Sequence, residues 1–148
     1  MMEWKIVPMA QHHVAQITEL ERLCFSDPWS ENSVRSELEN PLSFWLAAVA
    51  GEQVIGYIGS QTAAGESDIM NLAVTPEFRC RGVAQRLVTE LSDALRKREA
   101  SALMLEVRVS NHAAIRLYEK MGFIRVGLRP NYYFHPREDA LIMRKELI

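Results

Sequence analysis

Cysteine is scarce in this chain of 148 residues, and long apolar runs are missing. The two cysteines, Cys24 and Cys80, cannot build the disulfide framework of a small secreted protein, so they favour a reducing, cytoplasmic compartment. The longest apolar stretch, residues 44–50, is far shorter than the roughly 20 residues that a membrane-spanning helix needs. The chain also begins without the basic and apolar regions of a signal peptide, so we expect no membrane partner.

A strong excess of charge of either sign is absent as well. Lysine and arginine number 17 against 19 aspartates and glutamates, and the formal net charge of −2 disfavours direct binding to nucleic acids. Linkers and low-complexity segments are missing too, because the seven glycines and six prolines are scattered. With 48% hydrophobic and 24% charged residues, the composition is that of a folded protein, and the length predicts a single domain over residues 1–148.

Metal-ligand spacings and two common phosphate-binding motifs are not found either. The four histidines form no His-x-x-x-His pair and the cysteines no Cys-x-x-Cys, so we expect no metal. Gly-x-x-x-x-Gly-Lys-Ser/Thr is missing, which excludes a P-loop, and without Gly-x-Gly-x-x-Gly a dinucleotide-binding fold has no support.

Apolar periodicity and turn residues divide the first half of the chain into five elements. They are a strand at 4–7, a helix at 10–24, a second helix capped by Ser30 and ending at 39, and a hairpin of strands at 44–50 and 54–60. The apolar stripe of the first helix consists of Val14, Ile17, Leu20 and Leu23.

The second half alternates strands with helices. It begins with a strand at 67–74 and a loop at 79–84, followed by a helix to about 98, a strand at 102–109, a helix capped by Ser110 or Asn111 and ended by Gly122, and strands at 123–128 and 140–147 joined by a loop at 129–139. The long helix carries an apolar residue at every fourth position: Val83, Leu87, Leu91 and Leu95. This succession predicts an α/β or α+β domain around a mixed sheet.

The loop before the long helix has the features of an anion-binding site. The first N–H groups of a helix have no partner within it and lie at the positive end of its dipole. Gly82 has no Cβ and Ala84 is small, so an anion can approach the backbone closely. Arg79 and Arg81 add positive charge that would complement a phosphate. The alternative, which the loop alone leaves open, is an ordinary surface helix start with solvated arginines.

The same loop, Arg79-Cys80-Arg81-Gly82-Val83-Ala84, resembles the Gln/Arg-x-x-Gly-x-Gly/Ala signature of the GNAT superfamily of N-acetyltransferases. Residues 71–74 match the strand before that loop in the family, and residues 105–111 and 114–123 follow at the family's spacing. Together with Arg-Pro-Asn-Tyr-Tyr at 129–133, these segments are similar to the RimI type, which acetylates the N-terminal alanine of a small-subunit ribosomal protein.

The resemblance implies a fold and a co-substrate. The fold would be a mixed, mostly antiparallel sheet with a central splayed parallel strand pair and flanking helices. The co-substrate would be acetyl-CoA, its pyrophosphate held by N–H groups of residues 80–85 and its pantetheine arm paired with the backbone of residues 72–74. Asn111 and Tyr118 are two helical turns apart and would share a face toward the thioester. The implied cofactor-binding residues are Leu72, Ala73, Val74, Arg79, Cys80, Arg81, Gly82, Val83, Ala84, Gln85, Asn111 and Tyr118.

Acetyl transfer to an amine needs a neutral amine, a stabilised oxyanion and a proton for the leaving thiolate. The resemblance makes Glu106 the general base and Tyr118 the general acid of a direct transfer in a ternary complex. From the residues alone, Glu106 could instead face solvent between its apolar strand neighbours, and Tyr118 could merely pack its ring. A backbone N–H of residue 73 or 74 is expected to stabilise the oxyanion.

Cys80 is a separate candidate, because thiols beside arginines and helix N-termini become reactive. The family transfers the acetyl group directly and tolerates any residue at this loop position. We therefore expect Cys80 to take no part in the chemistry.

Aromatic residues in predicted loops are candidate walls for a peptide groove. The resemblance assigns Tyr132 and Tyr133 to the binding of the acceptor's N terminus. Phe25 and Trp29, which flank Pro28, fit the same role, but they could equally cover an open edge of the sheet.

These observations leave three functions open. The leading one is acetylation of a protein or peptide N terminus, with the N-terminal alanine of a ribosomal protein as the acceptor. A second is acetylation of a small-molecule amine, such as an antibiotic or a polyamine, since the cofactor half would be shared. A third is a non-catalytic acyl-CoA-binding module, which would need neither Glu106 nor Tyr118.

Overall fold

The computed structural model describes residues 3–148. Its elements, in chain order, are β1 (Lys5–Pro8), η1 (Gln11–His13), α1 (Val14–Cys24), α2 (Glu31–Ser36), β2 (Ser43–Ala50), β3 (Gln53–Ala63), β4 (Glu66–Val74), η2 (Pro76–Phe78), α3 (Val83–Lys97), β5 (Ala102–Arg108), α4 (His112–Lys120), β6 (Ile124–Tyr133) and β7 (Glu138–Glu146). The strands form one sheet in the order β1-β2-β3-β4-β5-β7-β6. Neighbouring strands are antiparallel except β4 and β5, which confirms the expected mixed sheet.

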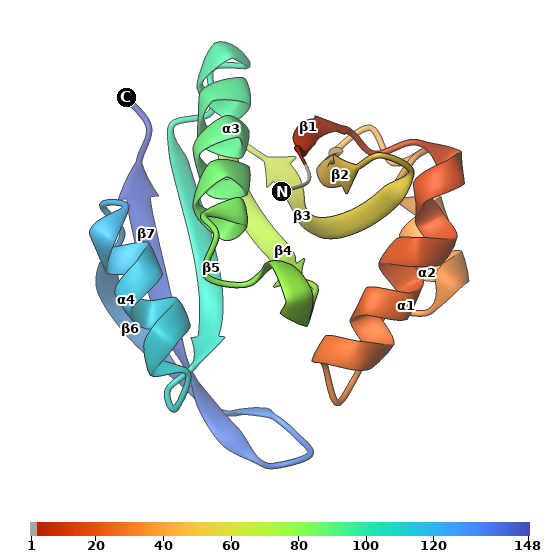
Figure 1. The fold of residues 1–148 in the computed structure, drawn as a ribbon. Helices are drawn as coiled ribbons and strands as arrows, with labels where there is room; N and C mark the ends of the chain where they lie inside the picture. Colours follow the sequence, from red (N-terminus) through yellow and green to blue (C-terminus); the bar gives the residue numbers. More distant parts are fainter. Residues whose placement is uncertain (1–2) are drawn as a thin grey trace.

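Helices cover both faces of this sheet (Figure 1). Strand β2 shows why, because its buried residues alternate between two apolar clusters. Trp45, Ala47 and Val49 pack with residues of α1 and α2, whereas the intervening Leu46 and Ala48 pack with residues of α3 and α4. The sheet is thus the middle layer of the molecule.

Helix α3 is placed by its apolar stripe. The four stripe residues have exposed fractions of 0–1%, so this part of the prediction is confirmed: Val83, Leu87, Leu91 and Leu95. Each fully buried leucine contributes about 1.5–3 kcal/mol relative to an exposed one, which fixes the helix against the sheet. No helix in residues 3–148 combines the length and the apolar character that crossing a membrane requires.

The predicted stripe of the first helix is wrong at one position. Val14, Ile17 and Leu20 are buried as expected, but Leu23 is 63% exposed and Glu21 is fully buried. Nine residues at 100° each place Leu23 on the opposite side of the helix from Val14, whereas Glu21 lies only about 20° from it. Glu21 therefore occupies a buried position on the helix, whereas the apolar pattern alone had predicted burial for Leu23.

The second helix is shorter than predicted. The hydroxyl of Ser30 accepts a hydrogen bond from the N–H of Ser33 at 3.1 Å, so the predicted N-cap is confirmed. The regular helix ends at Ser36, and a run of hydrogen-bonded turns continues to Asn40, before Pro41. The predicted helix over 30–39 merged the helix with these turns.

The predicted loop at 129–139 is largely strand. Strand β6 runs to Tyr133 and β7 begins at Glu138, so only four residues connect them. Tyr132 and Tyr133 therefore lie at the end of β6 and not in a loop. The register shifts between Arg129 and Tyr133, and this irregularity, which contains Pro130, hid the strand from a pattern of simple alternation.

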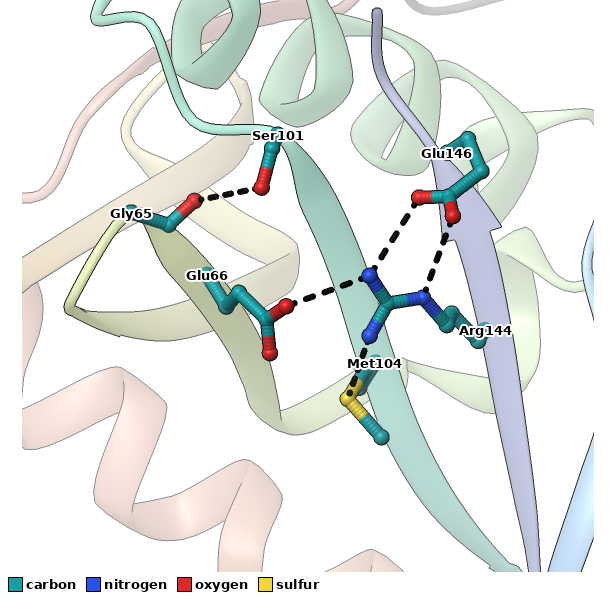
Figure 2. A network of polar contacts seen from close by, with 6 residues as sticks. All are labelled: Gly65, Glu66, Ser101, Met104, Arg144 and Glu146. Atoms are coloured by element: carbon teal, nitrogen blue, oxygen red, sulfur yellow. Dashed lines mark hydrogen bonds and ion pairs between the residues drawn. The ribbon is translucent and has the colours of Figure 1, made fainter.

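Strands β4 and β5 are paired at one end only. Their register covers Glu66–Asp68 of β4 against residues 102–104 of β5, and beyond it the two strands diverge (Figure 1). Figure 2 shows what holds the paired end: the Arg144 guanidinium on β7 donates to Glu66 at 3.1 Å and also contacts Glu146 and the sulfur of Met104. Side-chain contacts therefore join the strands at this end, and the strands are splayed at the other.

Candidate functional site

A groove of about 970 Å³ opens where β4 and β5 diverge. Its walls come from regions that are distant in sequence: the end of α1 and the loop that follows it, β4, the loop and first turn of α3 at Arg79 and Ala84, β5, α4, and the end of the β6–β7 hairpin. The predicted site residues that line it are Leu72, Ala73, Val74, Arg79, Ala84, Glu106, Asn111, Tyr118, Tyr132 and Tyr133. The fold therefore brings the predicted catalytic pair and the two tyrosines of β6 to one groove.

The predicted phosphate-binding loop leads into α3 beside this groove. Gly82 is the N-cap of α3 with φ +81°, a left-handed conformation that suits glycine, and Cys80 also has a positive φ of 62°. A Cβ built on Gly82 would meet no atom within 4 Å, so the space before the helix is open. Five predicted residues of the loop lie outside the groove lining, at the start of the helix: Cys80, Arg81, Gly82, Val83 and Gln85.

The two arginines of the loop differ in their contacts. The Nε of Arg79 donates to the carbonyl oxygen of Val74 at 3.0 Å, and its Nη2 lies 3.5 Å from the Sγ of Cys24. Arg79 thus joins the loop to the end of β4 and to the end of α1. The guanidinium of Arg81 lies 5.2 Å from the ring centre of Phe78.

Glu106 lies on β5 with its side chain about a quarter exposed. The Nε of Arg129 on β6 donates to its carboxylate at 3.2 Å. Glu106 thus forms an ion pair and also lines the groove, so the structure does not leave it facing open solvent. Asp68 on the neighbouring strand β4 is affected by this site. Its pKa is raised, first by burial and next by the negative charge of Glu106.

Tyr118 on α4 is 6% exposed, and its ring meets Phe123 edge-on at 5.4 Å between centroids. Burial raises the pKa of this phenol well above its usual range, so the hydroxyl stays protonated and can act as a proton donor. Asn111 is the N-cap of the same helix, and its side-chain oxygen accepts from the N–H of Ala114 at 3.2 Å. Asn111 and Tyr118 both line the groove, as their spacing predicts.

The two tyrosines of β6 pack edge to face, with ring centroids 5.0 Å apart. Tyr132 is about half exposed, and burial raises the pKa of Tyr133 to about 12. Both phenols are therefore neutral near pH 7 and offer hydroxyl donors at one end of the groove.

Arg108 is a groove residue that the sequence did not single out. Its guanidinium lies 4.5 Å from the ring centre of Tyr133 and donates to the carbonyl oxygens of Phe134 and Pro136. An ion pair with Glu138 at 3.1 Å completes its contacts, so Arg108 holds the hairpin end in place. Its position two residues after Glu106 puts both on one face of β5, a signal that alternation could have supplied.

The loop between α1 and α2 forms the opposite wall. Phe25 and Trp29 line the groove together with Cys24, Ser26 and Asp27, which the sequence had not indicated. The Oδ1 of Asp27 lies 3.0 Å from the Nδ1 of His135 near the hairpin end, so the two walls meet across the groove. Which loop faces which hairpin is a tertiary property, and no local pattern marks it.

Comparison with known proteins identifies the family. The profile of the acetyltransferase (GNAT) family matches residues 14–123. The [ribosomal protein bS18]-alanine N-acetyltransferase of Escherichia coli is 38% identical over 127 residues, which cover 84% of each chain. The N-alpha-acetyltransferase RimI of Mycobacterium tuberculosis is 37% identical over 134 residues, covering 86% of this chain and 83% of its own.

Solved structures agree with the sequence matches. The crystal structure of the Escherichia coli ribosomal-protein-S18-alanine N-acetyltransferase superposes with a TM-score of 0.90 at 31% identity, covering 98% of this chain and 94% of that one. A chain of the NatC complex bound to Gag peptide and CoA superposes with a TM-score of 0.86 at 28% identity, covering 99% and 100%. The chain belongs to the GNAT family of acetyltransferases.

Proposed function

We propose that this chain transfers the acetyl group of acetyl-CoA to the N-terminal α-amine of a protein, with the N-terminal alanine of a small-subunit ribosomal protein as its acceptor. The observation that carries the proposal is the groove between the splayed strands, which lies beside the start of α3. Glu106 and Tyr118 both line this groove. The relatives support the acceptor, because they are named for alanine acetylation of a ribosomal protein.

The residues present fit acetyl-CoA. The diphosphate would accept hydrogen bonds from the first N–H groups of α3 and the loop before it, where the open space at Gly82 leaves room. The pantetheine arm would lie along residues 72–74, which have no partner strand on the β5 side among the described residues. Acetyl-CoA supplies an activated acetyl thioester, and the chain supplies the groups that bind and orient it.

The chemistry then follows from the groups in the groove. An α-amine has a pKa of about 7.7–8.0, so a carboxylate needs to remove only one proton near neutral pH. Glu106 would accept that proton, directly or through a water molecule, and leave a neutral amine whose nitrogen forms a bond to the thioester carbon. The carbon–sulfur bond would break as Tyr118 donates its proton to the departing thiolate, and the surplus proton on the new amide nitrogen would return through water to the Tyr118 phenolate. An N–H of residue 73 or 74 stabilises the oxyanion in between.

The carboxylate of Glu106 would give the ammonium group of the acceptor a place to bind. An arriving ammonium group would compete with Arg129 for the same carboxylate, from which the guanidinium Nε lies 3.2 Å away. Tyr132 and Tyr133 supply neutral hydroxyls and aromatic surface beside that carboxylate for the first residues of a peptide. The pair of a base and an acid also favours an enzyme over a passive acyl-CoA-binding module.

An acceptor panel tests the proposal. Peptides that begin with alanine are expected to be acetylated at the α-amine with a higher kcat/KM than peptides with a bulky first residue, polyamines or aminoglycosides. Coenzyme A release and the mass of the product measure this, and a peptide with a blocked N terminus and an internal lysine is the control. Turnover of the small amines with no turnover of any peptide would refute the assignment.

Coenzyme A binding gives a second prediction. Gly82→Val places a β-branched residue at φ +81°, which costs about 1–2 kcal/mol, and puts a side chain into the space before the helix. We expect isothermal titration calorimetry to show at least a tenfold weaker Kd for coenzyme A. Gly51→Val is the matched control, because Gly51 also has a positive φ (61°) and open space but lies in the turn between β2 and β3. Equal Kd values for both variants would contradict the assignment of the loop.

A further inference from the structure

Helix α1 carries a carboxylate that the proposed chemistry does not use. Glu21 is fully buried, and the three groups in residues 3–148 that donate hydrogen bonds to its carboxylate are neutral. One oxygen accepts from the backbone N–H of Trp29 at 2.8 Å. The other accepts from the hydroxyl of Tyr57 and from the Nδ2 of Asn71, the latter at 2.8 Å.

The contact with Trp29 holds the loop between α1 and α2, which we call the acceptor loop. The loop between α1 and α2 contributes Phe25, Ser26, Asp27 and Trp29 to the groove. The N–H of Trp29 is bound by the Glu21 carboxylate, and the loop starts at Phe25, whose N–H donates to the carbonyl oxygen of Glu21. The side chain and backbone of one residue thus hold both ends of this loop.

The contact with Asn71 holds β4, the strand along which the pantetheine arm would lie. Asn71 lies on β4 directly before residues 72–74, in the part of the strand that has left β5. The pairing of β4 with β3 shifts register between Ile69 and Asn71, so the strand bends at this point. The bond from Asn71 to Glu21 ties the bent strand to α1 and not to β5.

We propose that Glu21 is a positioning residue, which sets the distance between the acceptor loop and the splayed strand by binding Trp29 and Asn71 at once. This inference rests on the proposed function, since it assumes that the acceptor lies along the loop and the thioester along β4. Reactions of two bound partners are sensitive to such spacing, and a misplacement of about 1 Å can cost 10²-fold in rate.

The test replaces one oxygen of the carboxylate. Glu21→Gln keeps the shape but cannot accept from Trp29, Tyr57 and Asn71 together, so one wall of the groove loses its tether. We expect kcat/KM for an alanine-initiated peptide to fall about 10- to 10²-fold, while the Kd for coenzyme A changes by a much smaller factor, because Glu21 contacts β4 but not the start of α3, where the diphosphate would bind. Steady-state kinetics and calorimetry on the intact chain measure the two quantities.

The chain offers a matched control in Glu37, a second buried carboxylate. It is 7% exposed and accepts from the Oγ of Ser43, the Nε1 of Trp45 and the Nε2 of Gln61, and it lines no part of the groove. Glu37→Gln should lower Tm by an amount similar to Glu21→Gln and leave kcat/KM within twofold. If both variants keep native kcat/KM, Glu21 is only a structural residue and the inference is wrong.

A third variant decides the matter if Glu21→Gln fails to fold. Asn71→Ser is too short to reach Glu21 and should lower kcat at least fivefold while KM for the peptide stays near native, because the Trp29 tether remains. Native kcat in this variant would overturn the inference. A native chain that acetylates no peptide would instead refute the proposed function, so the two failures are distinct.

Discussion

Glu106→Gln is expected to fold like the native chain and to lose turnover by 10²- to 10⁴-fold, the usual contribution of a general base. The substitution preserves the shape of the side chain and removes its capacity to take a proton. Its cost in stability should be about 0–1 kcal/mol, because the ion pair with Arg129 is partly exposed. Steady-state kinetics with an alanine-initiated peptide, together with a thermal melt, separates the two effects.

The dependence of the rate on pH is a second measurement on Glu106→Gln. Without a base, only an amine that solvent has already deprotonated can attack, so the residual rate should rise with pH through about 7.7–8.0. Glu66→Gln is the matched control, because Glu66 lies on the neighbouring strand and pairs with Arg144 at 3.1 Å outside the groove. Near-native kcat/KM in Glu106→Gln would remove Glu106 from the mechanism.

Tyr118→Phe is expected to lower kcat by 10²- to 10⁴-fold with little change in KM. The ring would keep its edge-on contact with Phe123, so packing is retained and only the hydroxyl is lost. Because burial raises the pKa of this phenol, the native residue stays protonated through the neutral and mildly alkaline range, and the defect should persist across it. Rate measurements between about pH 6 and 9 check this.

Tyr133→Phe is the comparison for that result. It removes a hydroxyl from the same groove at the place expected to hold the acceptor, so it should raise KM for the peptide more than it lowers kcat. Equal effects of the two substitutions on kcat would mean that Tyr118 has no special role as a proton donor.

Local patterns predicted most elements correctly. The stripe of α3, the cap of α2 at Ser30 and the helix end at Gly122 depend on a few consecutive residues, and each was confirmed. The errors arose where a contact with a distant segment overrides the local pattern. Glu21 is buried because Tyr57, Asn71 and the N–H of Trp29 satisfy its oxygens, and none of these partners is within one helical turn of it.

The candidate site divides in the same way. The residues of the loop at 79–84 suggested an anion-binding site, and the resemblance to the GNAT superfamily added Glu106 and Tyr118 as candidate catalytic residues. The residues that join the walls of the groove were not predictable, since the contact of Asp27 with His135 spans 108 positions of the chain. Arg108 is intermediate, because strand alternation could have placed it beside Glu106 but says nothing of the hairpin that it holds.

By itself, then, the sequence determined the alternation of strands and helices, the glycine that starts α3 and the family to which the chain belongs. Only the tertiary structure decided that β4 and β5 part after three paired residues, that Arg129 meets Glu106 and that Glu21 joins two walls of one groove. The physical reason is range: capping, helical periodicity and turn geometry act over a few residues, whereas a groove is built by packing between segments that the chain keeps far apart.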